Sequence, residues 1–146
     1  EVVTEAVKDF TSTLQDYPLQ IEFEEDPRSP ICSLAPLEFE LAVFNLLKNA
    51  KEALKAQKAD EPKVFIKISS GETHCFVDIS DNGAVISDSD FERMGSVFKS
   101  GKASGLGIGL SIVRSIVQNH NGSLVLERGE NGGLVCRIRL PIFNAE

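Results

Sequence analysis

The spacing of apolar residues in this chain changes repeatedly between the two periods of regular secondary structure, and this constrains its fold most. Over residues 36–57, apolar side chains return every three or four positions, which is the repeat of an amphipathic helix. Over residues 63–69 and 133–140 they return at every second position, as in a strand with one buried face. A chain with both patterns is expected to cover one face of a sheet with helices.

Turn residues divide the chain into the remaining expected elements. Helices are expected over residues 2–14, 36–57 and 109–120. Strands are expected over residues 19–25, 63–69, 74–80, 123–128 and 133–140. Residues 82–108, rich in Gly and Ser, are expected to be irregular, and a long loop in a compact domain is usually functional. The predicted fold is an α+β two-layer sandwich, with a mixed β-sheet and helices on one face.

The helix over residues 36–57 is the element that the sequence predicts most strongly. Pro36 suits a first helical turn, and Glu38 and Glu40 suit the positive end of the helix dipole. The apolar residues at helical spacing are expected to form its buried stripe: Leu37, Leu41, Phe44, Leu47 and Leu54.

The length and the net charge of the chain limit the classes of protein to which it can belong. The chain has 146 residues, which is the usual size of one domain, and we expect residues 1–146 to form a single domain. It begins at Glu1 without Met, so we expect a fragment of a longer protein. Its net charge is −7 and it has no basic patch, which argues against nucleic-acid binding. No apolar run is long enough to cross a membrane, and a cytoplasmic location is expected.

The cysteines and histidines do not form a pattern that points to a metal site. Cys32, Cys75 and Cys136 are far apart in the sequence and are expected to be reduced core thiols. Neither His74 nor His120 has the spacing of a zinc ligand to them. Both histidines are expected to be structural or solvated.

Polar residues in unusual places suggest a ligand site. Asn45 and Asn49 are four residues apart and share a helix face, nearly with Glu52, and amide oxygens suit magnesium. Asp81 continues the core face of the strand before it, where a carboxylate is costly unless it is hydrogen-bonded. An adenine amino group is a suitable donor, and Gly83 would let a base approach the backbone closely. Solvated asparagines and a simple Asp-Asn-Gly turn are the alternative interpretations.

A glycine run precedes the last expected helix. Gly105, Gly107 and Gly109 alternate and lead into a helix N-terminus, which offers N–H groups and a dipole to phosphates. The spacing is neither that of a dinucleotide fingerprint nor that of a P-loop, and a flexible loop is the alternative. Lys99 and Lys102 lie close enough in sequence to reach the phosphates.

These motifs, in this order, resemble the ATPase superfamily of histidine kinases, type II topoisomerases, mismatch-repair ATPases and the large ATP-driven chaperone. The resemblance covers roughly residues 20–140 and rests on Asn45-Leu-Leu-Lys-Asn-Ala, Asp81-Asn-Gly, the run from Gly105 to Gly109, Phe98 with Ser100-Gly-Lys102, and His120-Asn-Gly. The run at 98–102 is similar to that of nitrogen-regulation-type sensor kinases. The resemblance implies the α/β sandwich known as the Bergerat-type fold, the catalytic domain of a sensor histidine kinase, and ATP and Mg2+ as cofactors.

The resemblance also implies the residues of the site. Asn49 would hold the metal, Asp81 the adenine amino group, and Lys102 with the glycine run the phosphates, beneath a mobile lid over residues 88–104. The full implied set is Asn45, Lys48, Asn49, Glu52, Asp81, Gly83, Ile86, Phe98, Lys102, Gly105, Leu106, Gly107, Ile108, Gly109 and Leu110. No residue of the chain is expected to be the phosphoacceptor.

Two departures from the family pattern leave alternatives open. Val85 stands where the first glycine box usually has a second glycine, so a degenerate nucleotide-sensing or interaction module is one alternative. Asn45 stands where the chaperone and topoisomerase branches have a glutamate, which favours the kinase branch. An anti-sigma-type serine kinase is the other alternative.

As a kinase fragment, the chain is expected to work with partners. These are an upstream dimerisation and phosphoacceptor helical domain, which residues 1–17 would join, and the receiver domain of a response regulator. The fragment is expected to be a monomer and the full protein a homodimer, with the parent protein either free in the cytoplasm or anchored to the inner membrane.

Overall fold

A computed structural model describes residues 1–27, 32, 34–100 and 106–142, without the side chains of residues 97–100 and 106–108. The helices are α1 (Val2–Thr11), α2 (Pro36–Ala56), α3 (Asp88–Ser100) and α4 (Leu106–Asn119). The strands are β1 (Gln20–Glu25), β2 (Lys63–Ser70), β3 (His74–Asp81), β4 (Ser123–Arg128) and β5 (Leu134–Pro141).

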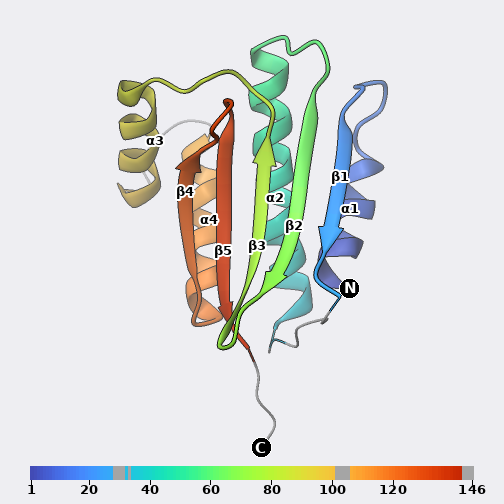
Figure 1. Ribbon diagram of the computed structural model, residues 1–146, viewed down its shortest axis with the longest axis vertical. Helices are drawn as coiled ribbons and strands as arrows, with labels where there is room; N and C mark the ends of the chain where they lie inside the picture. Colours follow the sequence, from blue (N-terminus) through green and yellow to red (C-terminus); the bar gives the residue numbers. More distant parts are fainter. Residues whose placement is uncertain (28–31, 33, 101–105, 143–146) are drawn as a thin grey trace, which may run out of the picture.

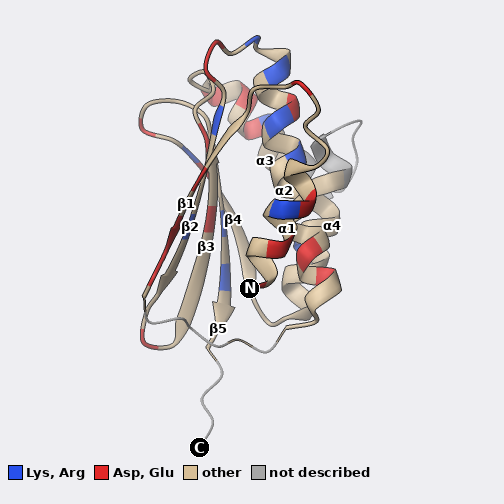
Figure 2. Ribbon diagram, turned by 90° about the vertical axis from the view of Figure 1, so that its right-hand side faces the viewer, with Lys and Arg blue, Asp and Glu red and all other residues tan. Residues whose placement is uncertain are grey.

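The strands form one mixed sheet in the order β1-β2-β3-β5-β4. β1 pairs with β2 in parallel, and the other neighbours are antiparallel. Figures 1 and 2 show that α1, α2 and α4 all cover the same face of this sheet, and no described helix covers the other face. This confirms the predicted two-layer α+β sandwich and places the core between the layers.

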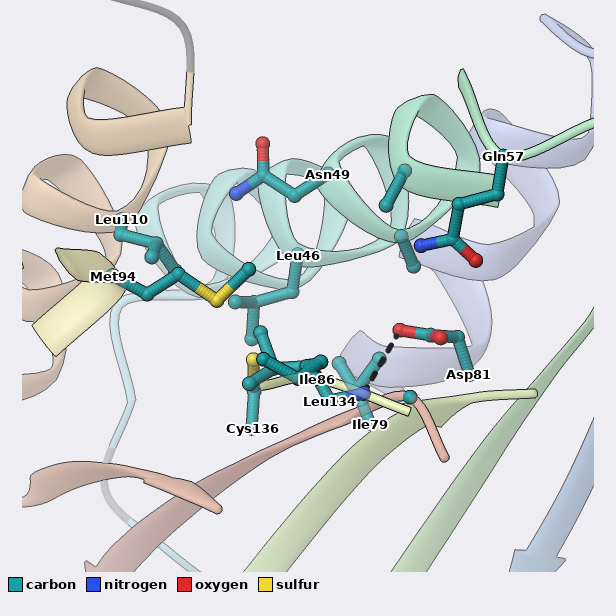
Figure 3. Close-up of a pocket in the computed structure, with 13 residues that line it drawn as sticks. Leu46, Asn49, Gln57, Ile79, Asp81, Ile86, Met94, Leu110, Leu134 and Cys136 are labelled. Atoms are coloured by element: carbon teal, nitrogen blue, oxygen red, sulfur yellow. Dashed lines mark hydrogen bonds between the residues drawn. The ribbon is translucent and has the colours of Figure 1, made fainter. Parts of the chain in front are cut away.

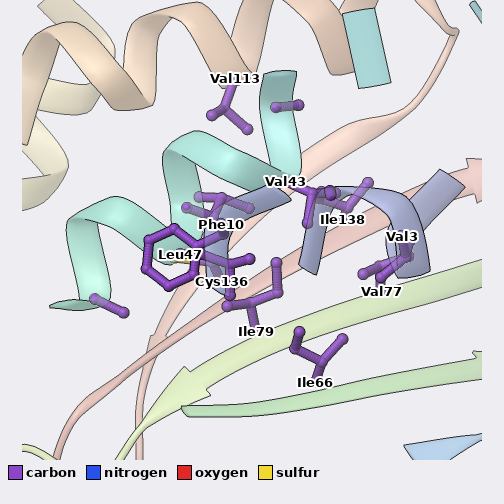
Figure 4. Packing of buried hydrophobic residues seen from close by; sticks show 14 of the residues in the cluster. Val3, Phe10, Val43, Leu47, Ile66, Val77, Ile79, Val113, Cys136 and Ile138 are labelled. Carbon is purple, nitrogen blue, oxygen red and sulfur yellow. The ribbon is translucent and has the colours of Figure 1, made fainter. Parts of the chain in front are cut away.

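Alternate residues of the central strands and one stripe of each covering helix fill the core (Figure 4). The largest fully buried side chains are Phe10, Phe39, Leu46, Leu47, Leu54, Ile66, Leu110, Ile138, Val43, Val64, Val113 and Val117. Phe10 of α1 also meets the half-buried Phe44 of α2 edge to face, with ring centroids 5.7 Å apart. α2 is therefore held between the sheet, α1 and α4.

The predicted buried stripe of α2 was wrong at its first turns. Leu37 is 80% exposed and Leu41 is 48% exposed, whereas Phe39 and Val43 are buried. At 100° per residue, positions two apart lie on nearly opposite sides of a helix. Near its N-terminus, the face of α2 that meets the sheet thus passes through Phe39 and Val43, and Leu37 and Leu41 lie on the other side.

The prediction that residues 82–108 are irregular was also wrong, because this span contains α3 and the first turn of α4. The hydroxyl of Ser87 accepts a hydrogen bond from the backbone N–H of Asp90 at 3.2 Å, which is an N-cap geometry. Asp88 and Asp90 then occupy the first turn, where the helix dipole favours acidic residues. These cap signals were readable in the sequence, but the Gly and Ser content concealed them.

The remaining boundaries differ from expectation by a few residues. α1 ends at Thr11 rather than at residue 14, and the chain then turns through Gln15, whose φ is +55°. α4 begins at Leu106, three residues before the predicted start, and its end is followed by Asn121 with a φ of +60°. The expected turns at Gly71 and at residues 131–133 are present.

The thiols are arranged differently from the prediction of separate core residues. The Sγ atoms of Cys32 and Cys75 lie 2.8 Å apart, and Cys32 is only half-buried and outside any strand. All three cysteines are free. Burial and the neighbouring Cys32 thiol raise the pKa of Cys75 to about 12, so it is a protonated structural thiol at neutral pH.

His120 has the structural role expected of it. Its Nε2 accepts a hydrogen bond from the backbone N–H of Ala35, the N-cap residue of α2, at 2.9 Å. Its Nδ1 lies 2.7 Å from the carbonyl oxygen of Ile116 and donates to it. The ring therefore joins the C-terminal end of α4 to the start of α2. No helix within the described ranges is long and apolar enough to cross a membrane.

The packing of α2 generates a paired prediction. Leu47→Ala should lower the free energy of unfolding by about 2–5 kcal/mol, because it leaves a cavity at a fully buried position. Leu37→Ala, the same change on the same helix at an exposed position, should change it by no more than about 0.5 kcal/mol. Urea denaturation measures both. Equal losses in the two variants would contradict the observed orientation of the helix.

Candidate functional site

An open hollow lies between α2 and the strands β3 and β5, with α3 and α4 at its margin (Figure 3). Its walls are largely apolar, and its polar side chains are few. The lining residues are Leu46, Asn49, Ala50, Ala53, Gln57, Ile79, Asp81, Ile86, Met94, Leu110, Gly133, Leu134 and Cys136. Such a composition is typical of sites for small ligands that are positioned by a few polar contacts.

Asp81 provides the carboxylate of this pocket. It is the last residue of β3 rather than the first residue after it, and its side chain points toward the helix layer, as the strand alternation predicted. One carboxylate oxygen accepts from the N–H of Gly83 at 2.8 Å and the other from the N–H of Leu134 at 3.4 Å. Burial raises the pKa of Asp81, and these two hydrogen bonds partly oppose the rise.

The turn between β4 and β5 packs directly on this carboxylate. Gly133 has a φ of +76°, and a Cβ atom there would lie 2.7 Å from Asp81 Oδ1 and even closer to the Asp81 carbonyl oxygen. Its N–H donates to the carbonyl oxygen of Ala84 at 3.0 Å. The sequence showed Gly133 only as a turn residue, but the structure makes it part of the pocket floor.

Asn49 provides the amide of the pocket, on α2. Its Nδ2 atom is buried and has no hydrogen-bond partner among the described residues. A Cβ atom at Gly109 of α4 would lie 3.1 Å from both amide atoms of Asn49, so glycine at this position lets the two helices approach. A buried amide donor without a partner is costly, and this indicates a ligand acceptor at this position.

Only some of the predicted site residues meet in this pocket. Asn49, Asp81, Ile86 and Leu110 line it, and Gly83 lies against Asp81. Asn45, Lys48 and Glu52 do not line it. The Asn45 amide instead donates to the carbonyl oxygen of Leu41 at 2.8 Å. Lys102 and Gly105 lie outside the described residues, as do the side chains of Phe98, Leu106 and Ile108 and the surroundings of Gly107.

Several lining residues were not among the predicted site residues. Ile79 and Cys136 were expected in the core, and the pocket opens above them. Met94 comes from α3, which the sequence analysis did not predict as a helix. Gln57 follows the last turn of α2 and accepts a hydrogen bond from the N–H of Ala84 at 2.8 Å. Its place near the pocket depends on where α2 ends relative to β3, which no local pattern specifies.

Val85 does not strain the loop after β3. Its side chain is 79% exposed, and the described non-glycine residues with positive φ are Gln15, Lys58 and Asn121. The loop is held through Ala84, by Gln57 and Gly133, and through the Ile86 carbonyl oxygen, to which Arg128 donates at 3.2 Å. Val85 therefore occupies the place of the second glycine without a strained backbone conformation.

The unpaired amide generates a prediction about stability. Asn49→Leu has a similar volume and removes a buried donor that lacks a partner, so it should raise the free energy of unfolding of the ligand-free domain by about 1 kcal/mol. Urea denaturation without ligand measures this change. Unchanged or reduced stability would mean that the amide is satisfied in the ligand-free protein.

Comparison with known proteins was consistent with this geometry. Residues 35–144 match the family described as histidine kinase-, DNA gyrase B-, and HSP90-like ATPase. Sensor protein FixL of Bradyrhizobium diazoefficiens is 30% identical over 84% of this chain and 24% of its own length. Sporulation kinase E of Bacillus subtilis is 28% identical over 92% of this chain and 18% of its own length.

A solved structure extends the comparison to the fold. The nucleotide-free catalytic domain of the histidine kinase ThkA superposes with a TM-score of 0.79, at 25% identity, over 96% of this chain and 89% of that one. The chain thus spans nearly the whole of a solved catalytic domain. It spans only about a quarter or less of the FixL and sporulation kinase chains.

Proposed function

This chain belongs to the family of histidine kinase-, DNA gyrase B- and HSP90-like ATPases, and it is similar to the catalytic domains of sensor histidine kinases. We propose that it forms a single domain that binds ATP with Mg2+ in the hollow between α2 and β3, and that it transfers the γ-phosphoryl group to a histidine on a separate helical domain.

The observation that carries this proposal is the partly buried Asp81 carboxylate at one end of an apolar pocket. A carboxylate in such a place needs a donor, and the exocyclic amino group of adenine supplies one while the flat ring fills the apolar space. The N–H groups of Gly83 and Leu134 orient the carboxylate without exhausting its acceptor sites. Ile79, Ile86 and Leu134 provide apolar surface beside the ring.

Asn49 is the residue best placed to hold the metal ion. Its amide oxygen has the chemistry that Mg2+ prefers, and its buried, unpaired Nδ2 fits a phosphate oxygen as acceptor. When bound, Mg2+ would offset the charge of the phosphates in a chain whose own net charge is −7. No group of three or more His, Cys, Asp or Glu in the described part of the chain could hold a metal without the nucleotide.

The chain's own residues would act by positioning the nucleotide. Asp81 fixes the base, Asn49 fixes the phosphate end, and the N-terminus of α4 directs its dipole toward negative charge. In-line transfer then needs an acceptor brought from outside. Both ring nitrogens of His120 bind the backbone, which supports an acceptor outside this chain.

The proposed partners follow from this incomplete reaction. An upstream dimerisation and phosphoacceptor domain would supply the histidine, and a response regulator receiver domain would take the phosphoryl group from it. The parent protein would be a homodimer, with this domain on the cytoplasmic side of the membrane or free in the cytoplasm. We also retain the nitrogen-regulation-type subgroup as a proposal; an NtrY-like sensor histidine kinase of Rickettsia bellii is 32% identical over 71% of this chain.

Calorimetry tests the proposed metal site. ATP should bind wild type more tightly with Mg2+ than with a chelator, and Asn49→Ala should weaken Mg2+–ATP binding at least about tenfold, because the metal loses a ligand. Asn119→Ala, an exposed asparagine near the end of α4, serves as the matched control and should bind as wild type does. Equal ATP affinity with and without Mg2+ would exclude the metal from the site.

Radiolabel transfer tests the proposed reaction. The isolated chain with γ-labelled ATP should acquire no label, because it has no acceptor histidine. Adding a separately prepared phosphoacceptor domain of the parent protein should produce acid-labile label on that domain. Label on His74 or His120, or acid-stable label on a serine, would contradict a histidine kinase acting on a separate domain.

A further inference from the structure

We propose that Gln57 is a second base-reading residue, which donates a hydrogen bond from Nε2 to the ring nitrogen next to the adenine amino group held by Asp81. This inference rests on the proposed binding of ATP in the pocket. It assigns to Gln57 a part of base recognition that is separate from its hold on the loop after β3.

Gln57 is held in place by the end of α2. Its backbone N–H donates to the carbonyl oxygen of Ala53 at 3.1 Å, and it adopts a helical conformation with φ −80° and ψ −7°. The side chain therefore leaves the last turn of α2 directly above the loop that follows β3. Figure 3 shows Gln57 and Asp81 at the same end of the pocket, with Asn49 toward the other end.

The orientation of the Gln57 amide follows from its backbone partner. The Ala84 N–H is a donor, so the atom that faces it at 2.8 Å is the amide oxygen Oε1. The amide nitrogen then lies on the other branch, and in Figure 3 it is turned toward the interior of the pocket. No acceptor for Nε2 is found among the residues that the structure describes. Gln57 is exposed, so this donor is open to solvent and can also reach a ligand in the pocket.

The Gln57 amide and the Asp81 carboxylate flank the same small space. A Cβ atom at Gly83 would lie 2.7 Å from Asp81 Oδ1, 2.8 Å from Gln57 Oε1 and 3.3 Å from Gln57 Nε2. Glycine at this position keeps both groups close to the loop and to each other. An acceptor and a donor are therefore presented side by side to one edge of a flat ligand.

This pair matches the edge of adenine. A single amide can read adenine with its oxygen on the amino group and its nitrogen on an adjacent ring nitrogen. Here the Gln57 oxygen is already engaged by Ala84, so Asp81 takes the amino group and Gln57 contributes the donor alone. The two residues divide between them the contacts that one free amide would make.

Variants of Gln57 with base analogues test this assignment. Gln57→Glu keeps an acceptor for the Ala84 N–H but removes the donor, and Gln57→Met removes both. Each variant and wild type is titrated with Mg2+–ATP, with its 1-deaza analogue and with its 7-deaza analogue. Each analogue lacks one of the two ring nitrogens next to the amino group. Gln118→Met on the exposed surface of α4 is the matched control.

Gln57→Glu should bind ATP at least about fivefold more weakly than wild type, the effect of one lost hydrogen bond, and Gln57→Met, which also loses the bond to Ala84, should bind at least as weakly as Gln57→Glu. For the analogue that lacks the accepting nitrogen, wild type and Gln57→Glu should differ by less than about twofold. Equal weakening of the binding of ATP and of both analogues would mean that Gln57 only holds the loop after β3. Unchanged ATP binding would mean that Gln57 neither holds this loop for binding nor contacts the base. Either result would overturn the inference. Failure of wild type to bind ATP would overturn the proposed function itself.

Discussion

The contact between the end of β3 and the β4–β5 turn is the constraint on which the candidate site depends. Gly133 must adopt a positive φ and must lack a side chain, since a Cβ atom there would collide with Asp81. Only then can the N–H of Leu134 reach the carboxylate and the N–H of Gly133 reach Ala84. This contact sets the direction of the Asp81 side chain and the path of the loop that follows. It also joins the two antiparallel strands that form the floor of the pocket.

The pocket keeps polar groups in an apolar place that the fold alone does not require. Burial disfavours the ionised form of Asp81, which its raised pKa expresses, and the Asn49 donor has no partner within the described protein. The folded, ligand-free domain therefore carries an energetic cost at two positions at once. In the proposed complex, both groups would gain what they lack from the nucleotide, whose base offers a donor and whose phosphates offer acceptors. Because the described protein offers the Asn49 donor no partner, these positions indicate function rather than stability.

The sequence predicted the layers of the fold better than it predicted the details within them. Strand alternation located Asp81 on the core face correctly, because that pattern depends only on local geometry. The phase of α2 failed at Leu37 and Leu41, since several leucines fit a helical repeat and only tertiary packing selects among them. The helix α3 was not predicted, because the Gly and Ser content of residues 82–108 favoured an irregular loop over the helix start that Ser87 caps. Gly133 and Gln57 could not be assigned to the site, as each reaches it through contacts between segments far apart in the chain.

The proposed contact between Asp81 and the adenine amino group is central to the proposed function, and calorimetry can isolate it. Wild type and Asp81→Ala are each titrated with Mg2+–ATP and with the triphosphate of purine riboside, which lacks only the amino group. The account predicts that wild type prefers ATP by about tenfold or more, as for a hydrogen bond to a charged group, and that Asp81→Ala has no such preference. The same preference in both proteins would show that the amino group does not bind Asp81, and the assignment of the adenine site would be wrong.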